Sequence, residues 1–199
     1  MKNVPINMDE YRNRLRSYFL TIVPNTNASE LNELIEEFSY HKFPKKEFIY
    51  AAGGTSDTLY FVLKGLIRVY YVKEDKEITN LLVTEGNIIV GAYNIITGEK
   101  NYSNYVAFED TYVLKIKYSV LESYYMKYHS LEHFGRKLVE KYYTSFMKKT
   151  YEVLFLSAEE RYQIFVKDHS ELLKRVPLKH IAAYLGIKQE TLSRLRAKY

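Results

Sequence analysis

Apolar residues near the start of the chain recur at the spacing of amphipathic helices. Residues 8–20 and 28–39 both show this pattern, and in the second segment Leu31 and Leu34 fall on one face. Ser29 stands where a helix N-cap is expected, because its hydroxyl can accept a hydrogen bond from a free backbone N–H of the first turn. The pattern predicts two short N-terminal helices.

Between about residues 42 and 117 the pattern changes to short runs of β-branched and aromatic residues. Glycine-containing or charged segments that are typical of turns separate these runs. The predicted strands are 48–51, 58–64, 66–72, 77–83, 88–90, 105–108 and 112–116. Short strands at this spacing indicate a sandwich or a small barrel, here a β jelly roll.

Helical spacing returns at Tyr118 and continues to about Phe155, which predicts one long helix with an apolar stripe. The stripe consists of Leu131, Phe134, Leu138, Tyr142 and Phe146. Beside it lie further residues of the same helix, namely Val139, Tyr143, Thr150 and Val153. Such a helix can pack on its own β domain or pair with a second copy across a two-fold axis. We take the five stripe residues as the predicted dimer interface.

The last part of the chain predicts a helix-turn-helix. Ser157 and Glu160 form a capping box that starts one helix, and Pro177 suits the start of the next. Ala182 is small enough for the crossing of two helices, and Gly186, four residues later, permits a left-handed turn. A final helix follows from about residue 189, with its leucines on the inner side.

The positive charge of the chain is concentrated in this region. Residues 169–199 hold seven Lys or Arg against two Glu, whereas residues 1–168 balance at 22 against 22, so these 31 residues account for the formal net charge of +5. A basic end on a neutral body indicates nucleic-acid binding. The predicted DNA-binding residues are Lys179, Lys188, Gln189, Glu190, Thr191, Ser193, Arg194, Arg196 and Lys198.

Three of these side chains have the chemistry to read bases. Arg194 can pair with guanine, Glu190 can accept from cytosine, and Gln189 can pair with adenine. The lysines, the hydroxyl residues and Arg196 suit phosphates. The alternative is an ordinary helical hairpin with a solvated charged face.

Composition narrows the class of protein. The chain has 199 residues, enough for two small domains, and it contains no cysteine. The absence of cysteine excludes disulfides, thiolate metal sites and iron–sulfur clusters, and an intracellular, cytoplasmic location is the simplest expectation. No apolar run is long enough to predict a membrane span. We expect no cofactor and no metal.

Over nearly all of its length the chain resembles the cyclic-AMP receptor protein/Fnr family of transcription regulators. The segment F-I-Y-A-A-G-G-T-S-D-T-L-Y-F-V-L-K-G-L-I-R-V-Y-Y is similar to the opening strands of a cyclic-nucleotide-binding jelly roll, and Q-E-T-L-S-R matches the recognition helix. The resemblance implies an α+β protein and a homodimer that binds a palindromic double-stranded DNA site. Gln189, Glu190 and Arg194 fall where the family reads its operator. RNA polymerase and an unknown small-molecule effector are further candidate partners.

The predicted phosphate cassette departs from the family pattern. Family members that bind cyclic AMP have Glu and Arg at two positions where this chain has Ala92 and Tyr102. Without the arginine there is no bidentate partner for a cyclic phosphate, so cyclic-nucleotide binding is not expected. Any effector would be neutral or less anionic, or the roll would be an unliganded scaffold. The candidate ligand-binding residues are Gly91, Ala92, Tyr93, Tyr102 and Ser103.

Two other classes of protein are alternatives. A metal-dependent cupin needs histidines on its strands, and none occurs between residues 42 and 128. His129 and His133 are four residues apart, but a third ligand is missing nearby. The chain has no nucleophile or phosphate-loop motif, so we do not expect an enzyme. A ligand-sensing or dimerisation module without DNA binding is the remaining alternative.

The sequence therefore predicts three parts. Residues 1–117 form a cyclic-nucleotide-binding-like sensor domain, residues 118–154 a long dimerisation helix, and residues 155–199 a helix-turn-helix DNA-binding domain.

Overall fold

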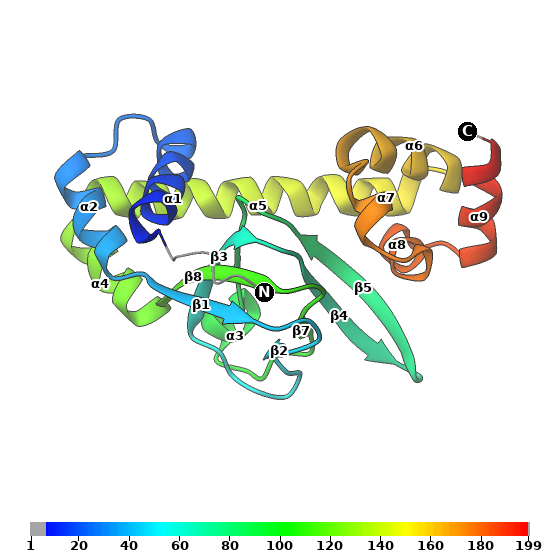
Figure 1. Ribbon diagram of the computed structural model, residues 1–199, viewed down its shortest axis with the longest axis horizontal. Coiled ribbons are helices and arrows are strands. Elements are labelled where there is room, and N and C mark those ends of the chain that lie inside the picture. Colours follow the sequence, from blue (N-terminus) through cyan, green and yellow to red (C-terminus); the bar gives the residue numbers. More distant parts are fainter. Residues whose placement is uncertain (1–6, 199) are drawn as a thin grey trace.

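The computed structural model describes residues 7–198. One helix, α5, runs along the molecule, with α1, α2 and α4 near its N-terminal end and α6–α9 around its C-terminal end (Figure 1). The helices are α1 (Met8–Ile22), α2 (Ala28–Glu36), α3 (Ala92–Thr97), α4 (Tyr118–Lys127), α5 (His129–Phe155), α6 (Ala158–His169), α7 (Leu172–Arg175), α8 (Leu178–Leu185) and α9 (Gln189–Lys198).

The strands form two four-stranded antiparallel sheets, in the orders β1-β8-β3-β6 and β2-β7-β4-β5. Together with the helices they make the predicted α+β architecture with a β-roll. The strands are β1 (Ser39–Phe43), β2 (Phe48–Tyr50), β3 (Thr58–Lys64), β4 (Ile67–Lys73), β5 (Lys76–Val83), β6 (Ile88–Val90), β7 (Asn104–Ala107) and β8 (Thr111–Lys117).

The space between the two sheets is filled with apolar and tyrosyl side chains. Residues that alternate inward along the strands supply them, as a packed sandwich requires. This inner core consists of Phe43, Tyr50, Tyr60, Val62, Ile67, Val69, Val83, Ile89, Tyr105, Ala107 and Val113.

Two elements of the roll were not predicted. The strand β1 reads Ser-Tyr-His-Lys-Phe, a polar pattern because it lies at a sheet edge and pairs only with β8. The helix α3 is six residues long, too short to show a helical period, and ends at Gly98 with φ of 73°.

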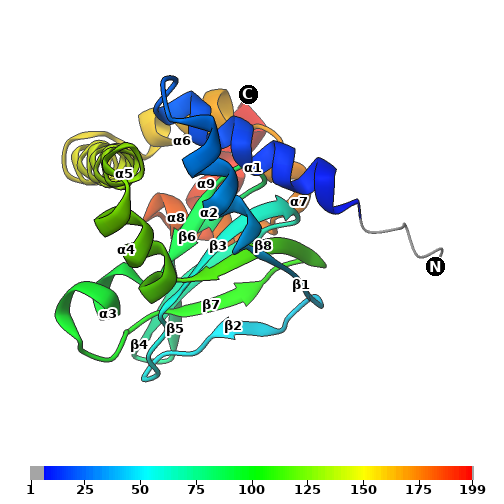
Figure 2. The ribbon, with the colours of Figure 1, turned by 90° about the vertical axis from the view of Figure 1, so that its left-hand side faces the viewer.

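The predicted long helix is two helices. The backbone of Tyr128 is extended, with φ of −129° and ψ of 112°, and separates α4 from α5. Helix α4 turns back onto α5, which α1 and α2 also contact (Figure 2). Gly135 of α5 permits this packing, because a Cβ there would lie 2.7 Å from the Tyr125 ring.

The helix caps follow local chemistry with one difference. The α2 helix is capped by Asn27, whose Oδ1 accepts from the N–H groups of Ser29 and Glu30, so the prediction of Ser29 as N-cap was wrong by two residues. The capping box of Ser157 and Glu160 is present at the start of α6.

Candidate nucleic-acid interface and ligand region

Helices α8 and α9 form a tight helical pair. Gly186 between them has φ of 65°, and its N–H donates to the last carbonyls of α8. The N–H of Ile187 also donates to the Ala182 carbonyl, at 3.0 Å, which completes a Schellman-type end of the helix. Ala182 is 2% exposed, as a helix crossing requires. The predicted turn chemistry therefore agrees with the geometry of this pair.

One core holds this C-terminal helical unit together, and its members come from each of its helices and from the roll. It consists of Leu66, Tyr162, Phe165, Leu172, Val176, Ile181, Ala182, Leu185 and Leu192. Leu66 is fully buried in it, although it belongs to the turn just before β4 of the roll. The helical unit therefore packs on the β-roll through a shared core.

The outer face of α9 is free for a partner. Leu192 is fully buried, whereas Gln189, Glu190 and Arg194 are exposed. Of the other predicted DNA-binding residues, Thr191 is half-buried; those exposed are Lys179, Lys188, Ser193, Arg196 and Lys198. The structure thus places three candidate base-reading side chains on one exposed helix, close to its N-terminus, which is the end that enters the major groove in helix-turn-helix proteins.

Lys198 has a partner within the chain. Its Nζ lies 2.7 Å from Oε1 of Glu159, on α6. This ion pair joins the end of α9 to α6, so the Lys198 ammonium is held against α6.

The five candidate ligand-binding residues lie in and around α3, and three of them are exposed on the surface. Gly91 is the N-cap of α3, and Ala92 is its exposed first residue. The rings of Tyr93 and Tyr102 lie 5.4 Å apart on the surface, 41% and 68% exposed. Ser103 donates its backbone N–H to Asn101 at 3.0 Å. A cavity of about 480 Å³ beside α3 is lined by none of the five.

Buried amides and tyrosines hold the segment around α3 onto the roll. The sequence did not predict these residues. Asn94 accepts from the Ser56 N–H at 2.7 Å, and the Asn101 amide donates to the Tyr105 hydroxyl at 3.3 Å. Both amides are at least nine-tenths buried, and burial raises the pKa of Tyr105. The Tyr105 ring lies 5.4 Å from that of Tyr50 inside the roll. The signal in the sequence was asparagine flanked by aromatic residues, which is too common to identify such a site.

Comparisons with known proteins identify the roll. Residues 40–128 match the family described as "Cyclic nucleotide-binding domain". This part of the chain is similar to that family. No curated protein matches the chain.

Several solved structures have a similar fold. FixK2 from Bradyrhizobium japonicum is 20% identical, with a TM-score of 0.69, over 81% of this chain and 83% of that one. A CooA mutant from Carboxydothermus hydrogenoformans is 20% identical, with a TM-score of 0.67, over 83% and 78%. The catabolite activator protein of Thermus thermophilus is 20% identical, with a TM-score of 0.57, over 89% and 85%. At these identities the likeness establishes the fold.

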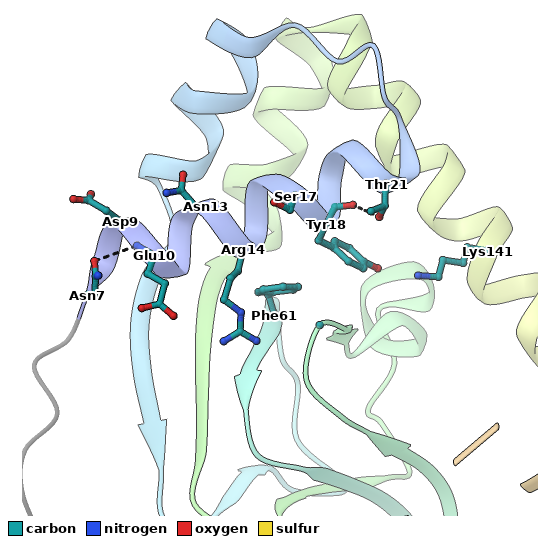
Figure 3. A pocket seen from close by; sticks show the side chains of 11 residues that line it. Asn7, Asp9, Glu10, Asn13, Arg14, Ser17, Tyr18, Thr21, Phe61 and Lys141 are labelled. Carbon is teal, nitrogen blue, oxygen red and sulfur yellow. Dashed lines mark hydrogen bonds between the residues drawn. The ribbon is translucent and has the colours of Figure 1, made fainter. Parts of the chain in front are cut away.

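The cyclic nucleotide-binding domain also borders a cavity of about 890 Å³ beneath α1 (Figure 3). Arg14 and Tyr18 of α1, Phe61 of β3 and Lys141 of α5 are among the residues that line it. The Lys141 Nζ lies 4.9 Å from the centre of the Tyr18 ring, a cation–π contact between α5 and α1. Burial, and then the neighbouring Tyr142, raise the pKa of Tyr18.

The predicted dimer interface needs a correction. Leu131, Phe134 and Leu138 are 0%, 1% and 7% exposed, because they pack into the core of α1, α2, α4 and the cyclic nucleotide-binding domain. The Tyr142 hydroxyl donates to the carbonyl of Ile88 and accepts from its N–H. Leu131, Phe134 and Leu138, which we call the buried stripe, are therefore not available to a partner, whereas Tyr142 is 39% exposed.

Of the predicted interface residues, Phe146 is the most exposed, at 67%. It lies in a second row of α5, at steps of three and four residues, which we call the exposed stripe. The exposed stripe consists of Val139, Tyr143, Phe146, Thr150 and Val153.

Within residues 7–198, no helix is long and apolar enough to cross a membrane, and no group of three or more His, Asp or Glu side chains is placed to bind a metal ion.

Proposed function

We propose that this chain is a DNA-binding transcription regulator of the Crp/Fnr type, which acts in the cytoplasm as a homodimer on a palindromic operator. The observation that carries the proposal is the exposed surface of α9, where Glu190 and Arg194 lie on the side opposite the buried Leu192 and Gln189 is exposed at the start of the helix. The net charge of +5 in residues 169–199 favours a polyanionic partner. The proposal retains the division into residues 1–117, 118–154 and 155–199.

The exposed stripe supports a homodimer. Steps of three and four residues over four helical turns are the pattern by which two helices pair, and an exposed apolar row of this length is costly in water. We therefore assign the exposed stripe, in place of the buried stripe, to the two-fold contact. Two copies would then place two α9 helices on one operator, with half-sites about one helical turn apart.

DNA binding is tested by fluorescence anisotropy on operators selected from a random library, at several salt concentrations. Arg194→Ala should lose about 1–3 kcal/mol per half-site on the preferred sequence and relax discrimination at one base pair. Lys188→Ala should weaken binding to all sequences alike and reduce the salt slope. Lys100→Ala, which removes the same charge from the exposed surface near α3, is the control and should change neither.

If Arg194→Ala left specific and non-specific binding unchanged, the assignment of α9 would be wrong. If the unmodified protein bound no DNA even at low salt, the remaining alternative, a sensing or dimerisation module, would be favoured.

Cyclic AMP is not the proposed effector. A buried phosphate needs a cationic or several hydrogen-bonding partners, and the position of the family's arginine is held by the exposed Tyr102. Calorimetric titration with cyclic AMP or cyclic GMP should show no saturable binding below about millimolar concentration. Micromolar binding that Tyr102→Ala and Ser103→Ala weaken would overturn this conclusion.

A further inference from the structure

A three-residue ion cluster joins the C-terminal helical unit to the turns of the β-roll. Arg175, at the end of α7, donates from Nη1 to Glu85 Oε2 at 3.0 Å and from Nη2 to Glu85 Oε1 at 2.9 Å. Its Nη2 also donates to Glu109. We call Arg175, Glu85 and Glu109 the Arg175 cluster. A bidentate arginine–carboxylate pair fixes orientation as well as distance, because both groups are planar.

The two carboxylates come from different turns of the roll. Glu85 lies between β5 and β6, and Glu109 lies between β7 and β8. Glu85 also accepts the N–H of Gly65, at 2.8 Å, from the turn between β3 and β4. Gly65 is required there, because a Cβ would lie 2.7 Å from backbone atoms of Asp110 and Thr111. The Arg175 cluster therefore connects α7 with three turns of the roll, namely those between β3 and β4, between β5 and β6, and between β7 and β8.

Electrostatics favours the closed cluster. Burial alone would raise the pKa of Glu85, but the hydrogen bonds and the charge of Arg175, with the backbone N–H of Gly65, lower it below its ordinary value. The pKa of Arg175 is raised, first by its hydrogen bond to Glu85. Because the side chains are 24–35% exposed, water screens part of this attraction. The inference therefore rests on the bidentate geometry of the Arg175–Glu85 pair.

Apolar packing beside the cluster makes the contact a docking surface. Leu66 is fully buried in the core of the helical unit, and Phe108 packs against that core. The His180 ring of α8 meets the Phe108 ring edge-on at 5.4 Å. The docking surface therefore lies between the roll and α8, the helix that supports α9.

The other connection between the two parts is the end of α5. Arg161 donates to the carbonyls of Val153 and Leu156, at 3.0 and 3.1 Å, and so caps that end. Lys149 of α5 lies 3.8 Å from the centre of the Tyr184 ring of α8. These contacts hold α6 and α8 near the end of α5, and the Arg175 cluster and the docking surface hold the helical unit against the roll.

We propose that Arg175 is a positioning residue, which sets the orientation of α9 relative to the roll and thereby the half-site spacing that the regulator prefers. The inference rests on the proposed DNA-binding homodimer. In such a dimer the distance between the two α9 helices must match one helical turn of DNA, so any freedom of the helical unit weakens the preference for one spacing.

The orientation is tested first without DNA. Because the chain contains no cysteine, nitroxide labels can be placed at Glu122→Cys in α4 and Ser193→Cys in α9, both exposed. Mixing with excess unlabelled protein makes electron–electron double resonance report the distance within one chain. We expect one narrow distance distribution, which Arg175→Gln broadens or shifts. Lys174→Gln, an exposed neighbour in α7 with the same loss of charge, should leave it unchanged.

The spacing is tested with operators whose half-sites are moved apart by one or two base pairs. Arg175→Gln should reduce the preference for the best spacing by about tenfold, equal to roughly 1.4 kcal/mol, which is in the range of one hydrogen bond to a charged group. Affinity for an isolated half-site should stay unchanged. Arg175→Lys, which keeps the charge but loses the fork, should give an intermediate preference.

The outcomes separate the two proposals. If Arg175→Gln keeps both the narrow distance and the spacing preference, the positioning role is refuted. If the unmodified protein binds no DNA, the proposed function fails, while the distance measurement still decides the role of the Arg175 cluster. If Arg175→Gln does not fold by circular dichroism, Glu109→Gln removes one acceptor from the same cluster and must broaden the distance for the inference to stand.

Discussion

The two stripes of α5 have similar sequence patterns, but one is buried within the chain and the other is exposed. The buried stripe includes Phe134, which is 1% exposed and stacks on Phe19 of α1 with ring centres 3.8 Å apart. The exposed stripe includes Phe146, which is 67% exposed. Both rows repeat at steps of three and four residues. An apolar period therefore shows that a helix has a face to bury, but the partner of that face depends on the rest of the chain.

The largest expected effect tests the buried stripe. Phe134→Ala should lower the free energy of unfolding by about 3–5 kcal/mol, because it leaves a cavity in a packed core. Urea unfolding measures the loss, which should be the same at all protein concentrations because the contact lies within one chain. Phe146→Ala is the matched control, and its effect should diminish as the protein is diluted. A large, concentration-independent loss for Phe146→Ala would contradict the distinction between the stripes.

Substitutions in the exposed stripe should have a smaller effect on folding. Their effect on dimer assembly should be complete. Tyr143→Asp with Phe146→Asp forces charge into the proposed two-fold contact, so a homodimer should become a monomer with unchanged circular dichroism. Sedimentation at micromolar concentration measures the state.

Tyr151 and Phe155 serve as the control for that experiment. They are also exposed and apolar, with ring centres 5.1 Å apart, but they lie outside the exposed stripe. Their double substitution by Asp should leave the dimer intact. A monomeric unmodified protein, or a dimer that survives the Tyr143 and Phe146 changes, would remove the exposed stripe from the proposal.

The smallest expected effect concerns two histidines, one partly buried and one exposed. They test the same contrast between buried and exposed side chains. Burial, and then the charges of Arg68 and Lys179, lower the pKa of His180 to about 4, while Glu77 opposes them. A lowered pKa means that the docked form favours the neutral ring, so its contribution is present above about pH 6.5 and is lost as the pH falls toward 4.

His180→Gln should therefore remove a part of the acid destabilisation, about 1 kcal/mol or less, because water screens a partly exposed ring. Thermal unfolding between pH 7 and pH 4.5 measures it. His129, which is exposed in α5, supplies the control substitution His129→Gln. Equal effects of the two substitutions would show that the docking surface does not exclude water from His180.

Local patterns predicted much of the fold. The strands 58–64 and 88–90 agree with β3 and β6, and the capping box at Ser157 starts α6. Gly186 adopts the predicted left-handed conformation. Each of these features depends on residues within one element or one turn, where sequence spacing and geometry are directly related.

Other features required contacts that are distant in the sequence. The strand β1 exists because β8 pairs with it, about 70 residues away. The position of Tyr102 in the sequence predicts a ligand-binding residue. In the structure its ring is exposed, next to the short α3 helix and the buried Asn101. The Arg175 cluster joins residues 66 and 90 positions apart, and no local pattern indicates that pairing.

The sequence by itself determined most of the helical and extended segments, the capping box at Ser157, and the gathering of basic residues near α9, because these follow from local propensity and composition. Tertiary structure alone decided which stripe of α5 is buried, which tyrosines fill the roll, and how Arg175 holds the C-terminal helical unit. The reason is physical: burial and ion pairing depend on which surfaces meet, and that is a property of the whole packed chain.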